Sequence, residues 1–193
     1  VCLVDIGGGT TDIAIFNSGS IVFTGVIPIA GDQVTSDIAQ ALRTPTPQAE
    51  EIKQKHGCSV AEFTKDDESI EVPGVGGIPT RELSRSSLAD IIQPRYTELF
   101  ELVKAEIARN GFEEKISAGI VFTGGTSKME GVVELAESIF QTSVRLGIPN
   151  KFSGMESILQ NPIYATSIGL VDHGFKQMND DLIAEQSQSW ISK

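Results

Sequence analysis

The stretch that decides the fold is the first one, VCLVDIGGGTTDIAIF at residues 1–16. An apolar run broken only by Asp5 ends at Ile6, three glycines and two threonines follow, and a second apolar run begins at Ile13. Apolar runs of this length, separated by glycine, are typical of buried strands joined by a tight turn. We therefore predict a hairpin here, extended by a third strand over residues 21–29 after a turn at residues 17–20.

The glycine turn at residues 7–11 has the composition of a phosphate-binding loop. Glycine lets the backbone approach an anion closely, and the N–H groups of such a loop can point at phosphate oxygens. The two threonines add hydroxyl donors, and the aspartate before the turn stands where a carboxylate can hold a hydrated Mg²⁺. The candidate binding residues are Asp5 (as metal ligand through water), Gly7, Gly8, Gly9, Thr10 and Thr11. Taken alone, the loop is equally compatible with a glycine-rich hairpin that binds nothing.

A second glycine loop follows another predicted buried strand, in IVFTGGTSK at residues 120–128. Such a turn lets a flat ring or a ribose lie against the backbone and presents N–H groups to it. The candidate residues here are Gly124, Gly125 and Thr126. Neither loop fits the Walker pattern, and neither fits the dinucleotide fingerprint, since the first loop leads into a strand. Two such loops on strands of one sheet predict that both border one cleft.

One region of the chain differs in texture from the rest. Residues 57–111 begin with short apolar runs between acidic and Pro-Gly-rich turns, which predicts a small sheet built from residues 59–63, 69–72 and 78–83. A long helix follows, and Pro94 is expected to bend or restart it. Its apolar stripe consists of Leu88, Ile91, Ile92, Leu99, Leu102, Val103 and Ile107.

Helices and strands alternate on both sides of this region. Helices are expected over residues 31–42, 48–55, 131–140 and 165–175, and further strands over residues 118–122 and 144–146. The polar segment from Lys176 onward is expected to be loose. The alternation, interrupted once, indicates an α/β domain that carries an inserted subdomain.

The composition of the 193 residues argues against several function classes. The net charge of −11 argues against a nucleic-acid partner, because a phosphate backbone requires a basic surface. No stretch is long and apolar enough to cross a bilayer. Cys2 and Cys58 lack metal-ligand spacing and are expected to be small buried side chains, which fits a reducing cytoplasm. The chain opens directly on a buried strand, from which we expect it to be part of a longer protein.

The motifs together resemble those of the actin, Hsp70 and sugar-kinase superfamily. DIGGGTTDI at residues 5–13 is similar to its second phosphate motif, and FTGGTS at residues 122–127 is similar to its adenosine motif. AEEIK at residues 49–53 is similar to the short helix that supplies a Glu and a Lys to the ribose and adenine. The matching residues are Glu50 and Lys53, for which an exposed ion pair is the alternative. The resemblance implies an α/β fold of the actin/Hsp70-like (ribonuclease-H-like) type, with a small α+β inserted subdomain.

Within that superfamily the chain most resembles the bacterial cell-division family FtsA. The resembling stretches are VTSDIA (34–39), KHGC (55–58), VPGVGG (72–77), PRYTEL (94–99) and YATSIGL (164–170). The implied domains are subdomain 2A (1–56 and 112–175), the inserted subdomain 2B (57–111) and a flexible tail (176–193) that leads towards a missing membrane-targeting helix. The first domain of the family, with the first phosphate motif, would precede Val1.

This resemblance implies a scaffold function. Proteins of the FtsA family bind ATP and Mg²⁺ between their halves, polymerise like actin, meet later division proteins, and tether the FtsZ ring to the cytoplasmic face of the inner membrane at the division site. Subdomain 2B binds the C-terminal peptide of FtsZ, and the corresponding residues here are Arg95 and Glu98. The chain alone, with one wall of the cleft, is expected to bind ATP weakly or not at all and to be inactive. The intact protein is expected to be at most a weak ATPase.

Two alternatives from the same superfamily remain open on the sequence. A sugar or acetate kinase needs a catalytic carboxylate and substrate-binding groups, which come largely from the first half. An Hsp70-like ATPase needs a peptide-binding domain after Phe175, where a short polar tail stands. For Arg95 and Glu98 the alternative is an ordinary solvated helix face. Arg95→Glu is expected to weaken peptide binding and to change stability little, since the site is expected to be exposed.

Overall fold

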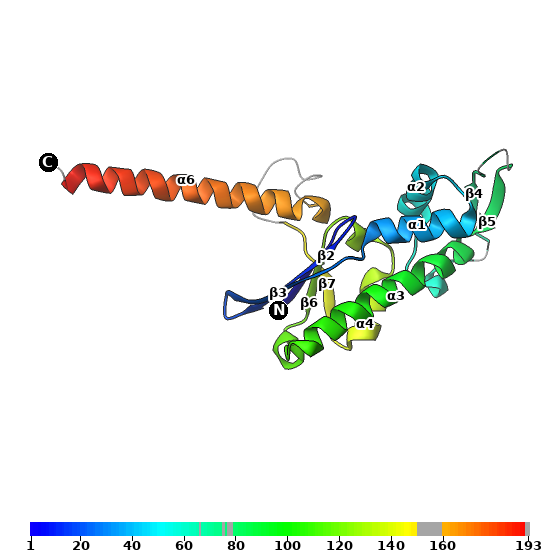
Figure 1. Cartoon of the computed structure of the whole chain (residues 1–193), viewed down its shortest axis with the longest axis horizontal. Helices are drawn as coiled ribbons and strands as arrows, with labels where there is room; N and C mark the ends of the chain where they lie inside the picture. The colour runs from blue at the N-terminus through cyan, green and yellow to red at the C-terminus, as the bar shows by residue number, and fades with distance from the viewer. Residues whose placement is uncertain (66, 75, 77–78, 150–159, 192–193) are drawn as a thin grey trace. The chain divides into compact units, whose positions relative to one another are not determined.

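Five strands form the central sheet of the first part of the chain (Figure 1). They are β1 (Cys2–Ile6), β2 (Thr11–Asn17), β3 (Ser20–Ile27), β6 (Ile120–Thr123) and β7 (Val144–Leu146). The computed structural model describes residues 1–65, 67–74, 76, 79–149 and 160–191, with side chains as far as residue 180. The chain folds as two compact units, Val1–Gly147 and Ile148–Lys193.

The sheet has the strand order β3-β2-β1-β6-β7. β1 pairs antiparallel with β2, and β2 pairs antiparallel with β3, so the first three strands form the predicted meander. β1 also pairs parallel with β6, and β6 pairs parallel with β7. The predicted hairpin, third strand and two later strands are therefore confirmed, and β1 lies at the centre of the sheet.

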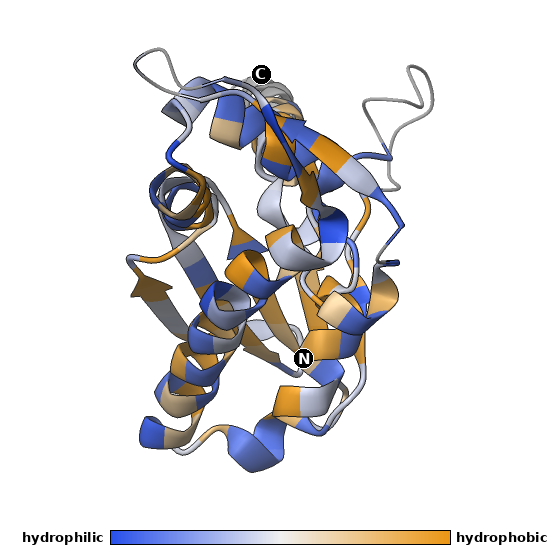
Figure 2. Ribbon diagram, turned by 90° about the vertical axis from the view of Figure 1, so that its right-hand side faces the viewer, coloured by the Kyte–Doolittle hydropathy of each residue, from blue (hydrophilic) through white to orange (hydrophobic). Residues whose placement is uncertain are grey.

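Alternate residues of the strands build the hydrophobic core on one face of the sheet. Cys2, Val4 and Ile6 of β1 are fully buried, as expected for burial with a period of two. Phe100, from a helix over this face, stacks on Phe122 of β6 with 5.2 Å between ring centroids. The helices carry both apolar and polar residues (Figure 2). Both cysteines are buried free thiols, and burial raises the pKa of the Cys2 thiol to about 11.

Two helices, α1 (Gly31–Leu42) and α2 (Thr46–His56), follow the meander and pack on each other. Arg43, which has a left-handed backbone with φ of 47°, ends α1. Pro45 stands at the N-cap of α2 and Pro47 lies in its first turn. Proline is tolerated there because the first N–H groups of a helix have no acceptor within it. Both predicted helices are confirmed.

The inserted region holds a two-stranded antiparallel sheet, β4 (Ser69–Val72) with β5 (Arg81–Ser84). The strand predicted over residues 59–63 is wrong, because the 3-10 helix η1 (Ala61–Phe63) forms there. The first N–H of η1 donates to the side chain of Gln93 (2.9 Å) instead of to a neighbouring strand. Three residues of the predicted Pro-Gly-rich turn lie outside the described residues: Val75, Gly77 and Ile78.

Helix α3 (Arg85–Arg109) runs for 25 residues without interruption. Pro94 was predicted to bend or restart this helix, and the restart does not occur, since Pro94 is exposed and water can satisfy the carbonyl that it leaves unbonded. The bend stays a prediction. Most of the predicted stripe is buried, but Leu102 is 40% exposed. Tyr96 and Phe100 are buried on the same helix and were not expected there.

Helix α3 also packs against β3 of the central sheet and against α4 (Val132–Phe140). Phe100 and Phe140 lie 5.8 Å apart between ring centroids. The connections after α3 use two 3-10 helices, η2 (Glu113–Ile116) before β6 and η3 (Thr126–Lys128) after it. Helix α3, predicted as part of the insertion, thus joins the insertion to the core. The predicted boundaries of the inserted subdomain stay predictions.

The second unit contains η4 (Pro162–Tyr164) and α6 (Ala165–Ile191) in its described part. The predicted last helix is confirmed, but the helix continues through Ile191 where a loose tail from Lys176 was expected. The sequence after Gly174 has no glycine or proline and is rich in residues of high helix propensity, which favours this continuation. No described helix is both long and apolar enough for a membrane span.

Candidate functional site

The two glycine loops leave the carboxyl ends of adjacent parallel strands. β1 ends at Ile6 and β6 ends at Thr123, and the two strands are hydrogen-bonded neighbours. From there the chain of β1 continues to β2 on one side, and that of β6 to β7 on the other. Open α/β sheets bind ligands outside the carboxyl ends of strands, at the point where neighbouring connections diverge. The topology therefore brings both predicted loops to the position of a ligand crevice.

A single backbone carbonyl, that of Gly7, joins three segments of this site. It accepts hydrogen bonds from the Gly31 N–H (3.2 Å) and from the Thr126 hydroxyl (2.7 Å). The next carbonyl, that of Gly8, accepts from the Asp32 N–H (2.7 Å). The first loop, the start of α1 and the second loop are thus tied together by hydrogen bonds.

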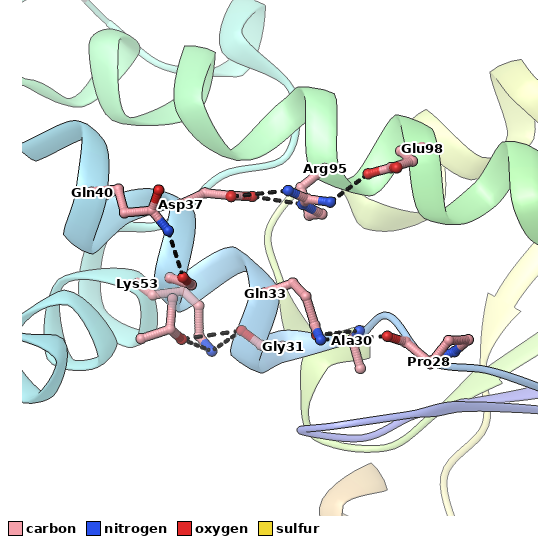
Figure 3. Close-up of polar contacts among 11 residues, drawn as sticks. Pro28, Ala30, Gly31, Gln33, Asp37, Gln40, Lys53, Arg95 and Glu98 are labelled. Carbon is pink, nitrogen blue, oxygen red and sulfur yellow. Dashed lines mark hydrogen bonds and ion pairs between the residues drawn. The ribbon is translucent and has the colours of Figure 1, made fainter.

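The start of α1 lies directly behind the first loop. The Ala30 N–H donates to Gln33 Oε1 (2.9 Å), which fixes the entry into the helix (Figure 3). The Asp32 carboxylate faces the loop, since a Cβ placed on Gly8 would lie 3.2 Å from its Oδ1. From the sequence, Gly31 and Asp32 were expected only to open a helix. Their contacts with the first loop depend on the tertiary structure. In the sequence, only the Gly-Asp pair itself could have pointed to these contacts.

Two glycines of the site have no room for a side chain. A Cβ on Gly31 would overlap the Thr126 hydroxyl. Gly124 has a φ of +86°, and a Cβ there would overlap both the Asp5 carboxylate and the Ile6 carbonyl. Asp5, the predicted magnesium ligand at the end of β1, therefore lies against the second loop.

Glu50 and Lys53 of α2 belong to a partly buried network and not to an exposed ion pair. Lys53 Nζ donates to the Gly31 carbonyl (3.0 Å; Figure 3). It also lies 2.6 Å from the Glu50 carboxylate and donates to the Thr35 hydroxyl (2.8 Å). The Lys53 side chain is only 10% exposed. Because its three donors are directed at protein acceptors, Lys53 braces the start of α1 and orients Glu50.

The Glu50 carboxylate is held in its ionised form by this network. Burial opposes ionisation, but hydrogen bonds from Lys53, Thr35 and Gln54 outweigh it and lower the pKa of Glu50. The side chain remains 38% exposed, so one part of the carboxylate stays accessible to a ligand. Sequence reasoning missed Thr35, which lies on α1 and meets Glu50 only through the packing of α1 on α2.

The two threonines of the first loop have different environments. Thr10 is exposed, and its hydroxyl donates to the Asp12 carboxylate (3.2 Å). Thr11 is fully buried, and its hydroxyl donates to the Ile29 carbonyl (2.8 Å). The prediction that Thr11 offers its hydroxyl to a phosphate is therefore not supported. Alternation along β2 places Thr11 on the core face with Ile13, where the loop cannot present it.

The second loop is held by a buried tyrosine. Tyr96 of α3 donates from its hydroxyl to the Thr126 carbonyl (2.9 Å). Burial, together with the nearby Glu50 carboxylate, raises the pKa of Tyr96 far above its ordinary value, so the phenol remains a neutral donor. The Ser127 hydroxyl donates to the Gly124 carbonyl (2.7 Å) within the loop.

Arg95, predicted as an exposed docking residue, is engaged inside the protein. Its guanidinium makes two bonds to the Asp37 carboxylate of α1, at 2.6 and 2.9 Å, and a third to Glu98, at 2.5 Å (Figure 3). The Arg95 side chain is 27% exposed, and the hydrogen bonds to Asp37 raise its pKa. The expectation that Arg95→Glu changes stability little depended on an exposed, solvated Arg95, and these contacts do not support it, because the substitution would place a third carboxylate between two others. Glu98 is 50% exposed, as predicted for a surface residue.

A groove of about 610 Å³ lies between η1 and α3, next to Glu98. Its lining consists of Ala61, Glu62, Asp90, Gln93, Pro94, Thr97 and Glu98. Three of these side chains are carboxylates, and none of the described lining residues is basic. The groove is therefore suited to a ligand with a positive charge.

A model of the family "Cell division protein FtsA" matches residues 2–169 of the chain. The chain belongs to the FtsA family. It is 58% identical over 192 residues to FtsA of Pseudomonas aeruginosa, covering 100% of this chain and 46% of that protein. It is 48% identical over 181 residues to FtsA of Escherichia coli K12, covering 90% and 43%. This chain thus spans less than half the length of these FtsA relatives.

Solved structures with the same fold are actin-like proteins. MreB5 of Spiroplasma citri bound to AMPPNP matches with a TM-score of 0.68 and 24% identity, over 90% of this chain and 55% of that one. A non-polymerising MamK mutant bound to AMPPNP matches with a TM-score of 0.59 and 17% identity, over 76% and 49%. The predicted actin-like α/β fold is therefore confirmed. Membership of the FtsA family sets aside the sugar-kinase and Hsp70-like alternatives.

Proposed function

We propose that this FtsA chain forms one wall of an ATP-binding cleft in a cell-division scaffold. The observation that carries the proposal is the meeting of both glycine loops with the start of α1 at the Gly7 carbonyl. The AMPPNP bound in the related MreB5 and MamK folds supports the same assignment. The proposed nucleotide-binding residues are Asp5, Gly7, Gly8, Gly9, Thr10, Glu50, Lys53, Gly124, Gly125 and Thr126.

Each group of these residues has a role that its surroundings favour. The exposed Gly8 and Gly9 allow phosphates to approach the backbone. Glu50 offers a carboxylate to ribose hydroxyls, and Lys53 holds that carboxylate in place. The second loop faces the adenosine. Thr11 is left out because its hydroxyl is bonded to the core.

Asp5 is the residue that would hold Mg²⁺ through water. Carboxylate oxygens suit this hard cation, which keeps several waters and takes its other ligands from nucleotide phosphates. Asp5 is partly buried at the end of β1, beside the second loop, which fits such a position. Bound Mg²⁺ would neutralise phosphate charge next to an acidic chain.

Nucleotide acts in this proposal as a conformational ligand, with at most weak ATPase activity. A ligand that binds the closed form better shifts the population towards that form. Self-association into actin-like filaments would follow from closure, and the related MamK is known as a double helical filament. ATP would thereby control assembly.

The proposed partner of the insertion is the C-terminal peptide of FtsZ. The acidic groove beside Glu98 would take a basic side chain of this amphipathic peptide, whose charges have both signs. Arg95 would shape the groove from behind, since Asp37 and Glu98 already engage its guanidinium. Later division proteins would be further partners, and no nucleic acid is expected.

The proposed location is the cytoplasmic face of the inner membrane at the division site. The family relationship supports a role in cell division. Attachment to the membrane would come from the membrane-targeting helix that the family resemblance implies.

Calorimetry with ATP tests the cleft. A full-length protein that carries this chain should bind ATP with Mg²⁺, whereas the chain alone should bind weakly or not at all. A single wall would leave much of the nucleotide surface exposed to water, whereas small-molecule sites usually bury most of their ligand. Tight binding by the chain alone would contradict the two-walled cleft.

Charge reversal in the groove tests the partner. Glu98→Lys should weaken binding of the FtsZ C-terminal peptide by at least about tenfold, because the groove then repels a basic side chain. Glu101→Lys is the matched control, since Glu101 is exposed on the same helix and does not line the groove. Equal affinities for the two variants would mean that the peptide binds elsewhere on the protein.

A further inference from the structure

We propose that Tyr96 is a positioning residue through which α3 couples the nucleotide loops to the partner groove. The inference rests on the proposed function, because it links the two sites assigned there. Two consecutive residues of α3 carry it. Tyr96 bonds to the second glycine loop, and Arg95 bonds to α1, whose N-terminus is hydrogen-bonded to the first glycine loop.

The first connection runs from α3 to the second loop. The Tyr96 hydroxyl donates to the Thr126 carbonyl, and the hydroxyl of the same Thr126 donates to the Gly7 carbonyl. Tyr96 is only 1% exposed, so its ring has no free space in which to swing away. A shift of Thr126 towards a nucleotide must therefore move Tyr96 or break this bond.

The second connection runs from α3 to the first loop through α1. The N-terminus of α1 is bonded to the loop at Gly31 and Asp32. Asp37, about one and a half turns along the same helix, receives both bonds from Arg95 (Figure 3). A helix transmits displacement along its axis, so a move of the first loop reaches Arg95.

The residues of α3 that line the groove lie in the same turns of the helix as Arg95 and Tyr96. Glu98 bonds to Arg95 and lines the groove, together with Gln93, Pro94 and Thr97. Arg95 and Tyr96, which connect α3 to α1 and to the second loop, therefore lie between the groove-lining residues 93–94 and 97–98. A ligand in the groove and a nucleotide at the loops both act on this short piece of helix.

Coupling of this kind is reciprocal. If nucleotide tightens peptide binding by some factor, peptide tightens nucleotide binding by the same factor. We expect nucleotide to tighten peptide binding, because loops fixed by a ligand also fix the orientation of α3. The second ligand then has less ordering to do.

The experiment measures the peptide Kd with and without AMPPNP-Mg²⁺ in a full-length protein that carries this chain. The wild type should show a ratio of about fivefold or more, within the usual range of allosteric coupling. Tyr96→Phe keeps the ring and deletes the hydroxyl, and should bring the ratio close to one. Tyr164→Phe is the matched control, a partly exposed tyrosine in the second unit, and should keep the wild-type ratio.

The outcomes separate the coupling from the function on which it rests. If the wild type binds both ligands with a ratio of one, or if Tyr96→Phe keeps the wild-type ratio, the coupling is overturned while the proposed function stands. If the wild type binds neither ligand, the proposed function fails. A second measurement does not need the peptide: AMPPNP should slow hydrogen exchange of the amides of residues 93 and 95–98, and Tyr96→Phe should remove that protection.

Discussion

The two glycine loops look alike in the sequence, but the fold requires glycine in only one of them. Gly124 of the second loop is buried, has a positive φ and meets the Ile6 carbonyl where a side chain would begin. Gly8 and Gly9 of the first loop are exposed and lack a positive φ. A Cβ on Gly8 would meet only the end of the Asp32 side chain.

This difference separates glycine that serves folding from glycine that serves a ligand. Folding explains Gly124, because an L side chain there is strained and collides with backbone. It does not explain a glycine with ordinary φ and open surroundings, such as Gly9. Close approach of a phosphate to the backbone does explain it, as the proposed function holds.

The largest expected effect is on Gly124→Ala. Strain at positive φ and overlap with the Ile6 carbonyl should together lower the free energy of unfolding by at least about 3 kcal/mol. Chemical denaturation measures it. The control is Gly111→Ala, which has φ of +71° but no neighbouring atom within 4 Å, and should lose only about 1 kcal/mol. Equal losses for the two variants would mean that strain at positive φ alone explains the effect at Gly124, without the overlap with the Ile6 carbonyl.

Gly8→Val should have the opposite profile. The valine side chain would occupy the space where phosphates approach, so measurable ATP binding should disappear. The free energy of unfolding without ligand should change by less than about 1 kcal/mol, since Gly8 is exposed and has ordinary φ. Calorimetry and ligand-free melting check the two halves. A large fall in the ligand-free melting temperature would mean that the fold itself requires glycine at position 8.

Gly31→Ala probes the contact between the loops. The new methyl group would displace the Thr126 hydroxyl from the Gly7 carbonyl, and one lost hydrogen bond should weaken ATP binding by about tenfold. Thr126→Val should reproduce the loss without a change at Gly31, and Thr126→Ser should restore the affinity. If Thr126→Val binds like the wild type, this bond does not align the loops.

The smallest expected effect is the pH dependence of the Glu50 network. The folded pKa of Glu50 lies below its ordinary value of 4.5, so its stabilising contribution is present above that pH and is lost as pH falls through the folded pKa. After discounting for its 38% exposure, Glu50→Gln should lower stability at pH 7 by about 0.5–1 kcal/mol.

Titration from pH 7 to pH 3 checks this sign. The stability difference between the wild type and Glu50→Gln should shrink below pH 4.5. Glu51→Gln is the neighbouring control, an exposed partner of Lys55, and its difference should be too small to resolve. A Glu50 difference that grows on acidification would contradict an ionised Glu50.

The sequence by itself determined the five strands of the central sheet, the existence of the main helices and the position of both glycine loops. These features depend on local patterns: apolar runs broken by glycine, helical spacing of apolar residues, and prolines at helix starts. The pairing of the two loops also followed, because each loop comes directly after a buried strand. The FtsA resemblance was readable for the same reason, since it lies in contiguous stretches.

Only the tertiary structure decided which of these residues meet. Thr11 looked like a ligand donor, but alternation along β2 and the Ile29 carbonyl place its hydroxyl in the core. Arg95 looked like an exposed docking residue, but Asp37, 58 residues away in the chain, engages it. Tyr96 had no local signal at all. Contacts between residues far apart in sequence depend on how helices pack over the sheet, and no window of neighbouring residues contains that information.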